Sequence, residues 1–494
     1  MKNTKKVFAL ILSLVLVLPI FGGMAESKDI IEIEFYTGRS FEGDAGTDLE
    51  KDNFVEQYIR ERLGVDIKYS YADDLATNLN LRLLSNDIPD IMNIPNRNYL
   101  NQYAASGYLL NLDEHKEQLA DAFAFTAGNA VSGKVDGVTY AIAGRPYGFR
   151  LAYWYNVNAF EEAGITEIPT TLEGYVDALR QIKANTADGI RNTIGLSGAG
   201  WDTLCQIFGA HGVTRPNVLS LNADGDVVDT MYTQEFYDAL VYANGLWQEG
   251  LLDREMFSLT STQVVDKAMT ETAISVYQQW PGIKKVVAWE AFLAVNPNAK
   301  WEIVGPLTGP DGKANYTGHY ANVGFTGLTA VNAELTGEKL DAALRLINFT
   351  ATEEGLSLLT HGVEGTHWDY NAQGVPVVRA EAVKDINFSW IYQLCGREEL
   401  SYCRVKFGEE AWKYVVQSDE QPFITDVTAL IDDPEWYNGV DAETYISEEC
   451  AKFLTGERPL NETEWDAFLN TLNSTYQYDK FIEAANEAWH KMVD

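Results

Sequence analysis

The chain has 494 residues, 37 of them basic and 72 acidic, which gives a formal net charge of −35 at pH 7. An electrostatic field of this sign repels polyanions, so nucleic acid and anionic lipid surfaces are excluded as expected partners. The length exceeds what one hydrophobic core usually holds, and it predicts two lobes or more.

The first residues have the three parts of an export signal. Lys2, Lys5 and Lys6 precede an apolar run over 7–21, and small residues follow up to Ala25. A bilayer span needs about 20 apolar residues, so a retained anchor is the less favoured alternative. We expect cleavage after about Ala25 and an exported protein in the periplasm or on the extracellular face of the membrane. No Cys stands near the cleavage point, so no lipid anchor is expected.

The first part of the mature chain alternates predicted strands and helices. Hydrophobic periodicity and a capping box at Thr47 and Glu50 carry this prediction. The order is typical of a parallel sheet covered by helices. Ligands of such sheets bind at the carboxyl ends of strands, so the loops at Arg39 and 96–98 are candidate sites. The predicted strands are 30–36, 65–71 and 88–92, and the predicted helices are 54–63 and 74–85.

Residues 144–158 form the densest aromatic stretch of the chain. Aromatic and β-branched residues favour a strand, and the Gly-Arg-Pro-Tyr-Gly entry favours an irregular approach to it. We interpret the stretch as a crossover between two α/β lobes, with aromatic side chains facing a cleft. Arg145, Tyr147 and Trp154 are therefore candidate site residues. A plain aromatic core strand is the alternative.

The alternation continues beyond the crossover, and no Pro/Gly/Ser linker separates the two halves. The lobes are therefore expected to be interwoven, with several crossings. One lobe should hold 26–144 and 318–364, and the other 145–317 and 365–494. The predicted strands are 193–197, 273–277, 301–304 and 318–331; residues 363–494 are expected to be mostly helical.

Catalytic and metal motifs are missing from the sequence. The six His residues have no metal-ligand spacing, and neither a phosphate loop nor a complete serine-nucleophile elbow occurs. We therefore expect no enzyme activity and no cofactor, although two suitably placed carboxylates would suffice for a glycosidase. Asn222, Asp224 and Asp226 alternate as in a calcium loop, but an Asp-Gly turn is favoured. Four Cys leave three disulfide pairings or free thiols open.

Four tryptophans lie at predicted strand ends or in Gly-rich loops rather than on helix stripes. An indole presents a flat apolar face beside a polar edge, which suits a pyranose ring. These tryptophans and their neighbours are candidate sugar-binding residues, although a single Trp is more often part of a core. The candidates are Trp154, Trp201, Trp280 and Trp368, with His367 beside the last.

Four segments follow one another over 272–360: TAISVYQQWPGI, WEIVGPLTGPDG, YANVGFTGLTAVNA and LDAALRLINFTATEEGLSLL. The tail adds GVEGTHWDYNAQGVPVV and KFLTGERPLNETEWDAFLNTL. The order of the first four resembles the maltodextrin-binding protein and its relatives, the family 1 extracellular solute-binding proteins of ABC importers. The two tail segments resemble a longer branch of that family, which includes alginate-oligosaccharide and lipoprotein-type sugar binders.

The resemblance implies an α/β, two-lobed periplasmic-binding-protein type II fold with interwoven lobes and a hinge. It also implies a carbohydrate, an oligosaccharide, bound in the cleft, ABC permease transmembrane subunits as partners, and a monomer. The family's stacking tryptophan falls on Trp280, and a second aromatic position on Trp368. Residues 184–189 have too few oxygen ligands for the calcium loop of longer members, so no metal is expected. The alternatives are a secreted carbohydrate-active enzyme and a binder of peptides or other polar solutes.

Overall fold

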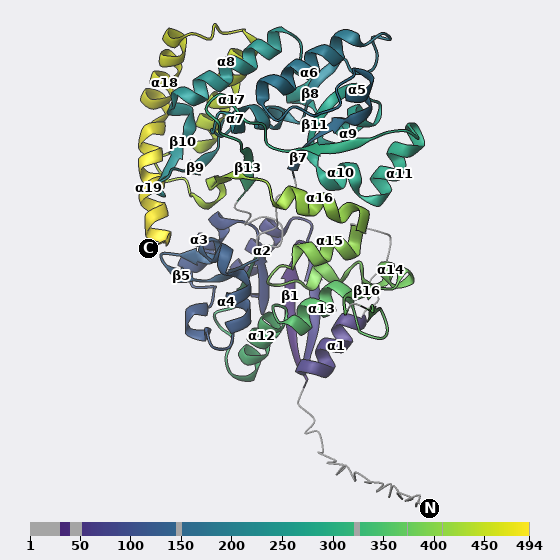
Figure 1. Ribbon diagram of the computed structural model, residues 1–494. Helices are drawn as coiled ribbons and strands as arrows, with labels where there is room; N and C mark the ends of the chain where they lie inside the picture. The colour runs from purple at the N-terminus through teal and green to yellow at the C-terminus, as the bar shows by residue number, and fades with distance from the viewer. Residues whose placement is uncertain are drawn as a thin grey trace, which may run out of the picture.

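The computed structural model describes residues 30–39, 52–144, 151–320, 327–372, 374–407 and 409–493. The chain forms two α/β lobes, one above the other in Figure 1. The predicted site residues Arg145 and Tyr147, the capping box at Thr47 and Glu50, and the export signal lie outside the described residues.

The first lobe is built on one five-stranded sheet of order β2-β1-β3-β14-β6. Strand β1 runs parallel to β2 and β3, whereas β14 runs antiparallel to β3 and β6. The strand β14 comes from far along the chain and lies between β3 and β6. The bounds are β1 Ile31–Thr37, β2 Val65–Tyr71, β3 Ile91–Ile94, β6 Ala141–Ala143 and β14 Leu328–Val331.

Helices cover both faces of this sheet because its strands are apolar on both sides. Ile33 and Phe35 belong to a core cluster with α1 and α12, while Tyr36 belongs to a second cluster with α2 and α3. Successive side chains of a strand point to opposite faces, which accounts for the division. The helices are α1 Phe54–Leu63, α2 Leu75–Leu84, α3 Arg97–Ala105, α4 Ala120–Thr126, α12 Gly337–Phe349 and α13 Glu353–His361.

The boundary between the lobes lies further along the chain than the sequence predicts. Tyr392, Leu394 and Cys395 are buried in the core of the first lobe, although 365–494 was assigned to the second. The hairpin of β15 (Trp368–Tyr370) and β16 (Pro376–Val378) also packs beside α13 of the first lobe. Apolar side chains near 390 bury against a sheet face that the earlier elements leave open.

The second lobe contains two four-stranded sheets, of orders β12-β7-β11-β8 and β10-β9-β17-β13. The predicted strand 318–331 is in fact two strands in different lobes, because β13 pairs with β17 here and β14 pairs with β3 in the first lobe. The bounds are β7 Leu151–Asn156, β8 Ile194–Ser197, β9 Leu219–Leu221, β10 Val227–Asp229, β11 Ala273–Gln279, β12 Trp301–Val304, β13 Tyr316–Tyr320 and β17 Phe423–Asp426.

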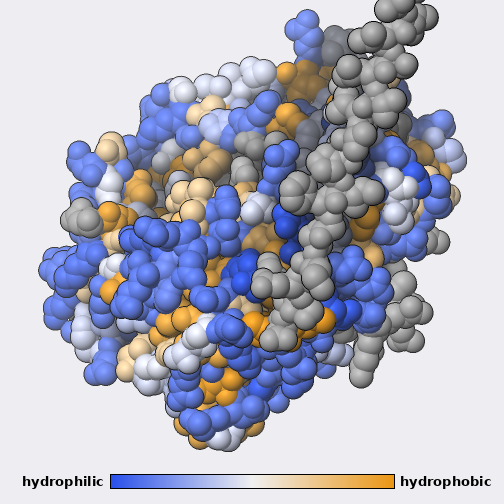
Figure 2. Space-filling view, turned by 90° about the horizontal axis from the view of Figure 1, so that it is seen from below, coloured by the Kyte–Doolittle hydropathy of each residue, from blue (hydrophilic) through white to orange (hydrophobic). Residues whose placement is uncertain are grey.

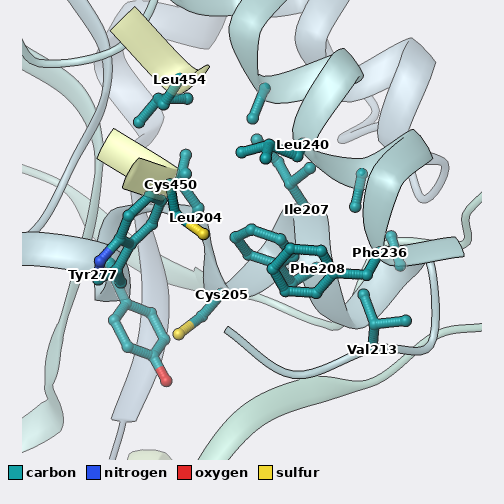
Figure 3. Close-up of a cluster of buried hydrophobic side chains, with 14 of the residues drawn as sticks. Leu204, Cys205, Ile207, Phe208, Val213, Phe236, Leu240, Tyr277, Cys450 and Leu454 are labelled. Carbon is teal, nitrogen blue, oxygen red and sulfur yellow. The ribbon is translucent and has the colours of Figure 1, made fainter. Parts of the chain in front are cut away.

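The largest core cluster lies in the second lobe and joins its sheets to the C-terminal helices. Figure 3 shows part of it, where Phe208, Phe236 and Leu240 gather beside Tyr277. All four cysteines lie among the described residues, are buried and form no disulfide. The helices are α5 Val157–Glu162, α6 Leu172–Asn185, α7 Cys205–Ala210, α8 Gln234–Gln248, α9 Ser261–Met269, α10 Trp280–Lys284, α11 Val286–Val295, α14 Val383–Ile386, α15 Glu399–Phe407, α16 Glu409–Asp419, α17 Gly439–Thr455, α18 Glu462–Tyr476 and α19 Tyr478–Val493.

None of the helices in the described part of the chain is long and apolar enough to cross a membrane.

Candidate functional site

The strand ends of the first lobe mark one side of the candidate site. In the register of the sheet, Leu328 pairs with Ile94 and with Ala143, so β3 and β6 end at the edge where β14 begins. Strand β1 runs parallel to β3 and ends at the same edge. The chain leaves for the second lobe beyond β6 and returns before β14, so this edge faces the other lobe.

The strand ends of the second lobe face the first lobe. Gln279 pairs with Leu151, and Ser197 lies beside Val276 on β11, so β8 and β11 end where β7 begins. Strand β7 is the first to follow the crossing, and its label lies near the boundary between the lobes in Figure 1. The carboxyl ends of the parallel strands therefore converge between the lobes, which is where α/β sheets bind ligands.

A chain of buried hydrogen bonds stiffens the first-lobe side. The Thr37 hydroxyl donates to Asn93 Oδ1 over 2.5 Å, and Asn93 Nδ2 donates to Thr329 Oγ1 over 3.1 Å. The Thr329 hydroxyl donates in turn to the carbonyl of Leu394 over 2.8 Å. The bonds join three strand ends to the segment that crosses between the lobes, so this wall is held rigidly.

Arg39, predicted as a site residue, lies at this wall and binds backbone. Its Nη1 donates to the carbonyls of Ile391 and Gln393 over 3.0 and 3.2 Å, and its own carbonyl accepts from the Tyr69 hydroxyl. Burial raises the pKa of Tyr69, so the hydroxyl stays a donor. Trp390, over which the Arg39 guanidinium lies at 6.0 Å, packs against the cores of both lobes.

Trp201, another predicted site residue, stands on the second-lobe side. It lies in the short helix Gly200–Leu204 directly after β8, is 9 % exposed, and meets the exposed Phe257 edge to face at 5.1 Å. Asp202 beside it has a carboxyl pKa raised by burial, and it pairs with Arg215 over 3.3 Å. A Cβ at Gly198 would lie 2.9 Å from the backbone of Thr203, so the tight turn requires glycine.

Gln206 is a candidate that the sequence reasoning missed. Its Nε2 donates to the carbonyl of Gly305 over 2.9 Å, whereas its Oε1 and the Thr203 hydroxyl are buried without a hydrogen-bond partner among the described residues. Buried polar atoms are normally satisfied, so atoms of this kind in the two short helices that follow β8 suit a polar ligand. No motif marks Gln206; only its place after the Gly-rich turn could have drawn attention to it.

The structure buries Trp154 and Trp280 in the core of the second lobe. Trp154 is 0 % exposed and donates from Nε1 to the carbonyl of Gln278 over 3.2 Å. Trp280 is 1 % exposed and belongs to the same core cluster, with Phe292 and Trp301. The expected projection of the Trp280 indole into a cleft is therefore wrong for this arrangement of the lobes.

Trp368 and His367 lie on the flank of the first lobe. Trp368 donates to the carbonyl of Gly362 over 3.0 Å and lines a pocket of about 480 Å³ between α1, α13 and the β15–β16 hairpin. The His367 ring lies 4.5 Å from Phe54, and burial lowers its pKa. The structure therefore brings these two residues together, but it does not bring them to Trp201.

The alternating acids at Asn222–Asp226 form a turn. Asn222 Oδ1 accepts the backbone N–H groups of Asp224 and Asp226, both over 2.9 Å, and Asp226 pairs with His490 over 2.8 Å. In the described ranges no group of three or more His, Cys, Asp or Glu side chains could hold a metal ion.

The family model for bacterial extracellular solute-binding proteins matches residues 46–355. Lipoprotein LipO of Bacillus subtilis is 20% identical over 59% of this chain and 60% of its own length. The multiple sugar-binding protein of Streptococcus mutans is 27% identical over 32% of this chain and 35% of its own length. The chain thus matches less than two thirds of the length of either relative.

Solved structures of solute-binding proteins share the fold. The alginate-binding protein AlgQ2 without calcium ion superposes with a TM-score of 0.65 at 16% identity, covering 94% of this chain and 99% of its own. An HMO-binding solute-binding protein from Bifidobacterium longum infantis reaches 0.67 at 12% identity over 94% and 99%. The two-lobed α/β prediction is confirmed. Because the family model matches most of the chain, the chain belongs to the bacterial extracellular solute-binding proteins.

Proposed function

We propose that this protein is the exported substrate-binding component of an ABC importer and that it captures an oligosaccharide between its lobes. The observation that carries the proposal is the convergence of strand ends from both lobes on one region, with buried polar atoms at its walls. Its partners are then the permease transmembrane subunits, and the captured solute passes to them from a monomeric receptor.

The names of similar proteins support a carbohydrate as the solute. One relative is a multiple sugar-binding protein, and the Streptococcus pneumoniae FusA structure, with a TM-score of 0.64 at 16% identity over 93% of this chain and 99% of its own, holds kestose. Hydroxyl-rich ligands need both donors and acceptors, which Gln206 and Thr203 supply. The proposal includes cleavage after about Ala25, no lipid anchor and no catalytic activity.

A ligand screen on the mature protein, residues 26–494, tests this function. Neutral oligosaccharides of increasing length, and a parallel set of short peptides, are added in a thermal-shift assay, and hits are measured by calorimetric titration. A ligand that binds only the folded state raises the melting temperature. We expect a shift with an oligosaccharide, recovered intact by chromatography. A response to peptides alone, or sugar cleavage at enzyme-like rates, would overturn the proposal.

Gln206→Ala tests where the sugar binds. Loss of one hydrogen bond costs about 0.5–1.5 kcal/mol, so the affinity should fall about two- to twelvefold. Gln181→Ala is the matched control, since Gln181 is exposed on α6 of the same lobe and its side chain donates to the carbonyl of Ala163 over 2.9 Å. Equal affinities for the two variants, both folded by circular dichroism, would place the sugar away from this wall.

A further inference from the structure

A pocket lies on the outer end of the first lobe, away from the region between the lobes. Its cavity volume is about 510 Å³, and its walls come from α1, from α12 and from the start of α13. Figure 1 shows α1 and α12 at the lower end of the molecule, and Figure 2 views the molecule from that end, where hydrophilic residues predominate. Pockets of 300–1,000 Å³ hold small organic ligands.

Arg345 of α12 lines this pocket. The Nε atom of Arg345 is buried, and the Arg345 side chain makes no hydrogen bond or ion pair with any of the residues that the structure describes. Asp341, one helical turn earlier, would ordinarily pair with it. The Asp341 carboxylate instead accepts from Gln118 Nε2 over 2.9 Å. In a chain with almost twice as many acidic as basic residues, an arginine left without an acidic partner is unexpected.

Arg62 and Glu354, which also line the pocket, are paired with each other. Arg62 binds Glu354 with two hydrogen bonds, from Nε over 2.8 Å and from Nη2 over 3.2 Å. Asn348 uses its Oδ1 to accept the backbone N–H groups of Asp121 and Ala122. Arg62 therefore balances the charge of Glu354. The guanidinium of Arg345 is the cationic group of the pocket whose hydrogen-bonding capacity is unused.

We propose that this pocket is a second ligand site, which binds the phosphate or carboxylate group of a small organic molecule on Arg345. A guanidinium presents a planar fork of donors that matches both oxyanions in a bidentate arrangement. The volume exceeds what a bare oxyanion fills, so an organic body occupies the remainder beside Leu63 and Phe349. The site is independent of sugar capture between the lobes.

Calorimetric titration at low ionic strength tests the second site. The mature protein is titrated with inorganic phosphate, glucose 6-phosphate, glucuronate and, as the neutral control, glucose. We expect binding of at least one anion that weakens when salt is raised, because screening reduces such contacts. The phosphate and carboxylate arms show which oxyanion the pocket prefers. Absence of binding by every anion would overturn the proposal.

Arg345→Met keeps the length of the side chain and removes a buried unsatisfied donor, so it should fold normally. We expect it to weaken anion binding at least tenfold, with Arg345→Lys in between because the charge remains without the fork. Arg180→Met, on α6 of the other lobe, is the control variant and should leave the affinity for the anion unchanged. Gln206→Ala should also leave anion binding intact, which separates this site from the sugar site. Wild-type affinity in Arg345→Met, with an unchanged melting temperature, would refute the assignment.

Discussion

Trp280 lies in the core of the second lobe with 1 % of its surface exposed. Truncating a buried aromatic side chain leaves a cavity, so Trp280→Ala should lower the free energy of unfolding by about 3–5 kcal/mol. Trp436, which is 49 % exposed, is the matched control, and its Ala variant should change stability by less than about 0.5 kcal/mol. Urea unfolding measures both. A stable Trp280→Ala variant that has lost sugar affinity would show that the indole reaches the ligand.

Asp229 is a buried carboxylate whose charge opposes folding. Burial raises its pKa to about 6, although the Tyr478 hydroxyl and the backbone N–H of Met231 donate to it. The unfolded value is about 3.9, so between about pH 4 and 6 the folded state binds more protons than the unfolded state. Stability from this group is therefore present at low pH and lost as pH rises through 6.

Asp229→Asn removes that dependence: its amide oxygen can still accept the backbone N–H of Met231, and its NH2 group can donate to the Tyr478 hydroxyl. The free energy of unfolding of the variant, relative to the wild type, should rise by about 2–3 kcal/mol between pH 4 and 7. Urea unfolding at both pH values measures the difference, in which the other titrating groups cancel. Parallel pH profiles for the two proteins would contradict the prediction.

The sequence alone could identify Trp280 as the end of a strand but not the direction of its indole. That direction depends on α16, more than a hundred residues away, since Tyr414 and Val415 share the cluster that buries the ring. Trp201 has the same local pattern, yet its ring joins the other core cluster of that lobe and is 9 % exposed. Side-chain orientation at a strand end is set by non-local packing, so periodicity cannot supply it.

At the scale of elements, the loop after α6 uses an arginine to satisfy its carboxylate. Asp188 Oδ1 accepts the backbone N–H groups of Ile190 and Arg191, and Oδ2 accepts from Arg191 Nε over 2.9 Å. These hydrogen bonds lower the pKa of the Asp188 carboxyl to about 2, and the bond from the Ile190 N–H has the largest effect. The oxygens that a cation would need are thus already engaged.

The melting temperature should therefore be the same with a chelator and with calcium at about 1 mM, a concentration at which weak extracellular sites are at least half occupied. Differential scanning calorimetry of the mature protein measures both conditions. A rise of several degrees on calcium addition would show that a cation binds in spite of Arg191.

Local signals predicted the regular elements of the first lobe well, including the parallel run of β1, β2 and β3, but they did not show which distant segments pair. The predicted helix 54–63 and strand 65–71 coincide with α1 and β2 because caps, glycines and periodicity are encoded locally. The single strand predicted over 318–331 failed, because pairing of Tyr316–Tyr320 with Phe423–Asp426 joins segments far apart in the chain. Nothing within that stretch reveals that its halves serve different sheets.

At the scale of the whole molecule, a polar contact joins the lobes beside their crossings. Arg97, at the start of α3, pairs with Asp432 of the second lobe over 3.2 Å, and Asn101 donates to the same carboxylate over 2.6 Å. Arg97 also contacts the sulfur of Met492 near the end of α19. The end of α19 lies beside α3 in Figure 1. This contact helps to hold the two lobes in their present arrangement.

Asp432→Ala should loosen that arrangement. Arg97 keeps the carbonyls of Ser132 and Lys134 as partners, so the first lobe should remain folded. We expect the unliganded variant to have a larger radius of gyration by small-angle scattering, because the lobes then populate additional arrangements. Glu435→Ala, an exposed carboxylate in the same loop, is the control. Superimposable scattering curves would show that the crossings alone position the lobes.

The interwoven plan has a consequence for a growing chain. Strand β14 is the fourth of the five strands of the first sheet and lies between β3 and β6. Until residue 331 has left the ribosome, β3 presents an unpaired edge and β6 has no place in the sheet. The residues of the second lobe up to β13 are made in the meantime. A nascent chain therefore stays incompletely folded for most of its synthesis, which is the condition in which an export channel can thread it.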